Sequence, residues 1–120
     1  MKRLIVALSL FAMPLMAQDV DRATSAAGGT VRWLDKVTGA TTDLALSREQ
    51  AVTRGFLTIQ LDDCRFPAAD PSSDAFAHLT IKDTRVDAPV FSGWMIASSP
   101  ALSALDHPRY DVWVLKCDNS

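Results

Sequence analysis

Alternation of apolar and polar residues with a period of two constrains the fold of this chain more than any other feature. In residues 75–82 the side chains of His78, Thr80 and Lys82 alternate with three apolar ones. Successive side chains of a β-strand point to opposite faces, so this period is typical of a strand with one buried face. Comparable segments occur at residues 31–35, 42–46, 56–64, 90–97 and 111–116. They predict an all-β fold, a small antiparallel sandwich or barrel of about six short strands.

One segment carries the signals of a helix instead. Two serines precede Pro100, in the order that is favoured at a helix N-cap and first helical position. Leu102 and Leu105 are three residues apart and would share one helix face. The residue before Pro108 is disfavoured in the helical region, so the helix has to end there. We predict one short helix near residues 99–105 that buries both leucines.

The first 17 residues have the pattern of a secretory signal peptide. Lys2 and Arg3 carry the only charges of this stretch, and an apolar run follows them towards Ala17. This run is shorter than the roughly 20 residues that a membrane-spanning helix needs. Position 18 is Gln, where a lipoprotein would have Cys. We therefore expect cleavage near Ala17 and an exported, soluble protein with no membrane insertion afterwards.

Composition divides the rest of the chain into a leader and one domain. Residues 18–30 are rich in Ala, Gly, Asp, Ser and Thr and show no apolar period, which predicts a flexible leader. The remaining segment, residues 31–120, has the size of a single small domain.

The chain has two cysteines, Cys64 and Cys117. In an exported domain of this size such a pair usually forms a disulfide, although two separate buried thiols are the alternative. A C-x-x-C motif, which zinc binding or redox chemistry would favour, is absent from the sequence. We therefore predict a structural disulfide between Cys64 and Cys117.

The charge of the chain excludes one class of partner. The net charge is −2, and removal of Lys2 and Arg3 with the signal peptide would make it −4. A nucleic-acid-binding protein needs a basic surface, which this composition does not provide.

Metal and phosphate sites are not indicated either. Asp70 and Asp74 are too few for a calcium loop, and no glycine-rich phosphate loop is present. We expect no metal, no cofactor and no nucleic acid.

A cluster of polar residues surrounds the expected helix. Ser99 and His107 raise the possibility of a small hydrolase, because a serine nucleophile needs a nearby base. The sequence has no Gly-x-Ser-x-Gly turn to present such a serine, which favours helix capping by the serines and helix termination at His107.

The same cluster forms our predicted binding surface. Amphipathic aromatic residues beside a loop are typical of interfaces, and two of them flank this segment. We predict that the binding surface contains Trp94, Ser99, Ser103, Asp106, His107 and Tyr110.

The segment from Gly93 to Cys117 carries a resemblance to a known family. It contains Gly-Trp-Met-Ile-Ala-Ser-Ser-Pro-Ala-Leu from Gly93 and His-Pro-Arg-Tyr-Asp-Val-Trp from His107, with Trp-Leu-Asp-Lys-Val-Thr-Gly upstream from Trp33. These residues closely resemble an uncharacterised family of exported alphaproteobacterial proteins, catalogued as a domain of unknown function. The resemblance covers residues 31–117 and implies a bacterial periplasmic setting, without implying an activity.

Three hypotheses about function follow from these features. The first is a non-enzymatic periplasmic protein that binds an envelope protein or another envelope component. The second is a proteinaceous inhibitor of a cationic envelope hydrolase, which an acidic mature protein would attract electrostatically. The third is a small hydrolase that uses Ser99 and His107.

Overall fold

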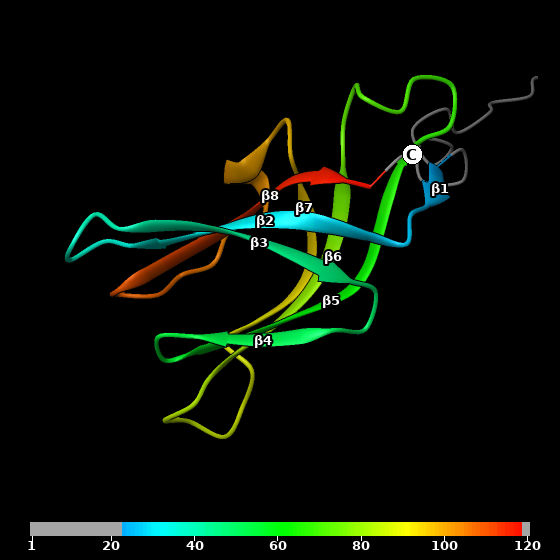
Figure 1. Cartoon of the computed structure of the whole chain (residues 1–120). Coiled ribbons are helices and arrows are strands. Elements are labelled where there is room, and N and C mark those ends of the chain that lie inside the picture. Colours follow the sequence, from blue (N-terminus) through cyan, green and yellow to red (C-terminus); the bar gives the residue numbers. More distant parts are fainter. Residues whose placement is uncertain (1–22, 119–120) are drawn as a thin grey trace, which may run out of the picture.

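The computed structural model describes residues 23–118, which form two antiparallel sheets packed face to face (Figure 1). The strands are β1 (Ala23–Ser25), β2 (Gly28–Asp35), β3 (Thr41–Ser47), β4 (Ala51–Arg54), β5 (Leu57–Pro67), β6 (Phe76–Asp83), β7 (Phe91–Ile96) and β8 (Tyr110–Cys117). One sheet has the order β1-β5-β6-β7, with β4 also paired to β5, and the other has the order β3-β2-β8. The predicted all-β fold is confirmed, and of the two predicted forms, sandwich or barrel, it is the sandwich.

The core lies between the two sheets and follows the alternation in the sequence. In β5, Leu57, Ile59 and Leu61 are fully buried, and Leu79 and Ile81 of β6 are their cross-strand neighbours. Val31 of β2 and Val112 of β8 cover this layer from the opposite sheet. Burial of one face of each strand is the main source of stability in such a fold.

The six segments with a period of two correspond to β2, β3, β5, β6, β7 and β8, whereas two short strands were not predicted. One of them, β1, lies within the expected leader, and β2 begins there too, at Gly28, so residues 23–30 of that segment contribute strands to the sandwich. β1 pairs with the end of β5, and the Ala26 N–H donates to the Cys64 carbonyl at 2.7 Å. The expected signal peptide and residues 18–22 lie outside the described residues.

A disulfide joins the two sheets. Cys64 of β5 and Cys117 of β8 are bonded, with their Cα atoms 5.7 Å apart. The bond confirms the predicted pairing, and both cysteines are buried in the core.

The predicted helix is corrected to a single 3-10 turn, Pro100–Leu102. Ser99 makes no side-chain cap, and the backbone is already extended at Ser103. Leu105 is buried as predicted, but Leu102 is 77% exposed. A helix this short is stable only when packing supports it, and one buried leucine does not support two turns. No helix within residues 23–118 has the length and apolar character needed to cross a bilayer.

Candidate binding site

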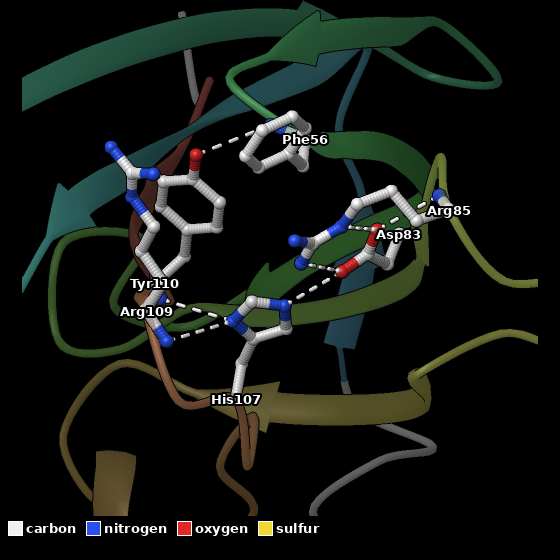
Figure 2. A network of polar contacts seen from close by, with 6 residues as sticks. All are labelled: Phe56, Asp83, Arg85, His107, Arg109 and Tyr110. Atoms are coloured by element: carbon white, nitrogen blue, oxygen red, sulfur yellow. Dashed lines mark hydrogen bonds and ion pairs between the residues drawn. The ribbon is translucent and has the colours of Figure 1, made fainter.

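His107 lies in a buried polar network where β8 begins (Figure 2). Its Nε2 is 2.9 Å from Oδ2 of Asp83, the last residue of β6. Its Nδ1 accepts hydrogen bonds from the backbone N–H groups of Arg109 and Tyr110, at 3.0 and 3.1 Å. A neutral imidazole with its proton on Nε2 satisfies all three contacts. His107 therefore holds the turn that leads into β8.

The prediction that His107 and Tyr110 belong to an exposed surface is corrected, because their side chains are only 4% and 2% exposed. The Tyr110 ring packs against Trp33 and His107, with both pairs of ring centroids 5.3 Å apart. Its hydroxyl accepts a hydrogen bond from the Phe56 N–H at 3.3 Å. Aromatic residues beside a loop suggested an interface, but the pairing of β8 with β2 turns this ring into the core.

The geometry does not support Ser99 and His107 as a catalytic pair. Both ring nitrogens of His107 are occupied by Asp83 and by backbone N–H groups. No hydrogen bond joins Ser99 to His107 in the part of the chain that the structure describes; Ser99 bonds through its backbone to Ile96 and Leu102. A general base needs a free nitrogen within reach of the nucleophile, and His107 does not provide one.

Two buried carboxylates, Asp83 of this network and Asp35, bind arginines. Asp83 accepts hydrogen bonds from Nε and Nη2 of Arg85, at 2.9 and 2.7 Å. The pKa of Asp83 is held well below its usual range, first by these Arg85 hydrogen bonds and then by the one from His107. Asp35 has a lowered pKa in the same way, chiefly because Nη2 of Arg109 donates to it at 3.1 Å. Both carboxylates therefore remain ionised although they are buried.

Of the two aromatic residues in the predicted binding surface, Trp94 is the exposed one. Its side chain is 40% exposed, whereas that of the next residue, Met95, is 1% exposed and faces the core. Trp94 and Tyr110 therefore lie on opposite sides of the sheet that contains β7. Ser103 is half-buried and Asp106 exposed on the connection to β8. The predicted residues do not form one surface.

A groove lies beside Trp94 on the outer face of its sheet. Its volume is about 670 Å³, and most of its lining is apolar. It lies between β1, the end of β5 and β7, and its lining includes Ala23, Pro67, Ala68, Phe76, Trp94 and Ile96. An exposed tryptophan next to an apolar groove is the arrangement that anchors a partner side chain in many interfaces.

His78, one of the alternating polar residues of β6, borders Trp94. The ring of His78 meets the Trp94 ring edge-on, with centroids 5.2 Å apart. His78 Nδ1 lies 2.8 Å from Asp62 Oδ2, which also accepts a hydrogen bond from the Thr80 hydroxyl at 2.7 Å. Donation by Nδ1 leaves Nε2 of His78 available as an acceptor.

A β-bulge produces this arrangement. The register of β5 and β6 shifts between Leu61 and Asp63, so Asp62 is an extra residue that turns towards His78. The consecutive acids Asp62 and Asp63 interrupt the alternation of β5, and this interruption is the sequence signal that could have located the bulge.

β7 is an edge strand without the usual protection. Its sequence, Phe-Ser-Gly-Trp-Met-Ile, contains no charged residue and no proline, which are the residues that normally guard an edge. The Ala97 N–H donates to the Ala75 carbonyl, and in an antiparallel pair every second residue bonds to the neighbouring strand. The residues between those bonded ones, which include Ser92 and Trp94, therefore direct their backbone N–H and C=O groups away from β6. Within residues 23–118 no backbone group outside the sheet pairs with Ser92 or Trp94.

The fold and this site define a small, disulfide-linked β-sandwich domain with an open edge strand and an exposed aromatic groove. Residues 29–117 match the model of a family described as "Uncharacterized protein conserved in bacteria (DUF2155)". The chain belongs to this family, which confirms the resemblance noted in the sequence.

The chain is also similar to an uncharacterised protein of Rickettsia prowazekii (strain Madrid E). The two are 29% identical over 93 residues, which is 74% of this chain and 59% of the Rickettsia protein. The chain thus matches less than two thirds of that relative's length. No solved structure matches the chain significantly.

Proposed function

We propose that this protein is a non-enzymatic binding domain of the bacterial envelope, located in the periplasm, that holds an extended segment of a partner protein along β7. The observation that carries the proposal is the uncharged, unpaired edge of β7 next to the exposed Trp94. An edge of this kind is a template for an added strand.

The binding mode follows from strand geometry. Backbone groups of the partner would pair with those of Ser92 and Trp94, which point away from β6. Every second side chain of the added strand would face the outer side of the sheet, next to the groove. The groove is mainly apolar, so an aliphatic or aromatic partner side chain would bury best there.

Two features support the proposed location. The signal-peptide pattern at the N-terminus directs a chain out of the cytoplasm. The Cys64–Cys117 disulfide is of the kind that persists in an oxidising compartment.

Site-specific photo-crosslinking in the living host tests the function. In the test protein a photoreactive amino acid replaces Ser92 at the open edge of β7. In the control protein it replaces the exposed Leu102. We expect a defined crosslinked protein from position 92 that is absent from position 102 and is lost when Trp94→Ala is added. The proposal fails if position 92 gives no crosslink, or if the same crosslink forms with Trp94→Ala at equal folded protein.

A further inference from the structure

Three exposed apolar side chains lie on turns at one end of the sandwich. Val37, Phe56 and Val86 are 74%, 37% and 52% exposed. They belong to the β2–β3, β4–β5 and β6–β7 connections. Phe56 immediately precedes β5, whereas the Trp94 groove lies at the other end of β5, beside Pro67. The Trp94 groove is therefore separate from this end, although β7 itself begins next to the β6–β7 connection.

Hydrogen bonds and ring contacts hold the three turns together. The Lys36 N–H donates to the Arg109 carbonyl at 2.8 Å, and the Thr84 N–H donates to the Phe56 carbonyl at 2.7 Å. The guanidinium carbons of Arg85 and Arg109 lie 4.3 and 5.8 Å from the centre of the Phe56 ring. Figure 2 shows the Arg85 guanidinium between Asp83 and the Phe56 side chain. The three turns form one surface.

Basic residues accompany each apolar tip. Lys36 precedes Val37, Arg85 precedes Val86, and Arg54 is two residues before Phe56. Lys36 and Arg54 are exposed and take part in no ion pair within the described residues.

The acidic residues of this end are distributed differently from the basic ones. Asp35 and Asp83 are buried beneath Arg109 and Arg85, whose side chains remain 40% and 54% exposed. The exposed carboxylates are those of Asp87 on the β6–β7 connection and Asp106 on the β7–β8 connection. The outermost groups are therefore mainly cationic and apolar.

We propose that this end of the domain docks on an anionic phospholipid surface. Val37, Phe56 and Val86 enter the boundary between headgroups and acyl chains, where short apolar tips and aromatic rings are stabilised. Lys36, Arg54, Arg85 and Arg109 contact lipid phosphates. The stacking of Arg85 on Phe56 keeps a cation and an apolar ring side by side, so both reach the membrane surface together. Docking this way leaves the Trp94 groove free.

Vesicle cosedimentation tests the proposal with the protein purified after export, so that residues 1–17 do not contribute. The probes are vesicles of phosphatidylethanolamine with phosphatidylglycerol, and vesicles of phosphatidylcholine alone. We expect binding to the anionic vesicles that weakens with salt, and little binding to the neutral ones. Equal binding to both, or none to either, overturns the proposal.

Surface substitutions separate docking from folding. Val37→Ser with Val86→Ser should weaken binding to the anionic vesicles by about tenfold, because two apolar tips no longer enter the interface. Lys36→Gln with Arg54→Gln should weaken binding to the anionic vesicles and reduce its salt dependence. Leu102→Ser is the control, since Leu102 is at least as exposed as either valine but lies on the connection between β7 and β8. This variant should bind like the unaltered protein.

Wild-type binding by the double valine variant, or an equal loss in Leu102→Ser, excludes this surface as the docking site. The crosslink at position 92 is read separately, so failure of vesicle binding leaves the strand-binding proposal intact.

Discussion

His107 Nε2 and Asp83 Oδ2 lie 2.9 Å apart with both residues buried, and this contact ties the end of β6 to the start of β8 across the two sheets. The imidazole is neutral in this geometry, because its other nitrogen accepts two backbone N–H groups. The contact thus acts as a structural clamp at one end of the sandwich.

Replacement of His107 should destabilise the domain. His107→Ala leaves two buried N–H groups without their acceptor, which predicts a loss of about 3 kcal/mol in the free energy of unfolding. Urea denaturation of the purified protein measures this loss. His78→Ala, at a half-exposed position, serves as the control and should cost less than about 1 kcal/mol. Equal stability of His107→Ala and the unaltered protein would contradict the role of the clamp.

Acid should weaken the fold through Asp83. Arg85 and then His107 hold the folded-state pKa of Asp83 below that of the unfolded chain, so the folded protein binds a proton less readily. The stabilisation is therefore complete above the unfolded pKa of about 4 and is lost as pH falls through the folded pKa. Melting temperature should decrease on acidification below about pH 4, and the decrease should be shallower in Asp83→Asn. If the melting temperatures of Asp83→Asn and the unaltered protein fall equally with pH, Asp83 does not contribute to the acid sensitivity.

Leu105 and Leu102 offer a matched pair of substitutions in one connection. Leu105 is 6% exposed and packs in the core, so Leu105→Ala should lower the free energy of unfolding by about 2–5 kcal/mol. Leu102→Ala removes the same atoms from an exposed position and should change it by less than about 0.5 kcal/mol. Chemical denaturation measures the free energy of unfolding of both variants. Similar losses in the two would contradict the burial of Leu105 and the exposure of Leu102.

Gly55 should tolerate no side chain. Its φ of +61° favours glycine, and a Cβ atom there would lie 2.5 Å from the Tyr110 hydroxyl oxygen. Gly39 also has a positive φ, +80°, but has open space around it. We expect Gly39→Ala to cost about 1 kcal/mol from backbone strain alone, and Gly55→Ala to cost clearly more. Thermal denaturation compares the two, and equal losses would rule out the Tyr110 contact as a constraint.

Loss of the disulfide should be costly because it links the sheets. Cys64→Ser with Cys117→Ser removes a crosslink over a separation of 53 residues, which predicts a loss of about 4 kcal/mol in the chain-entropy description. Guanidinium denaturation of the variant against the oxidised protein measures the difference. Detection of two free thiols in the denatured, unreduced protein would contradict the bond itself.

The sequence alone determined those features that depend on local pattern. A period of two assigns faces within a strand, so the six longer strands and the burial of Leu79 and Ile81 could be predicted from residue order. The burial of Leu105 and the cysteine pairing were also predicted, because apolar side chains favour the interior and a lone pair of cysteines allows one pairing only.

The tertiary structure alone decided which polar and amphipathic residues are buried. Burial of His107 depends on Asp83, 24 residues away, and the Tyr110 hydroxyl meets a backbone N–H 54 residues away. A polar group is stable inside a protein only when such a partner is present, and sequence order does not reveal which distant residue the sheets bring there. The same reason explains the short strands β1 and β4: their three and four residues carry too little periodicity, and each is defined by the hydrogen bonds that β5 supplies.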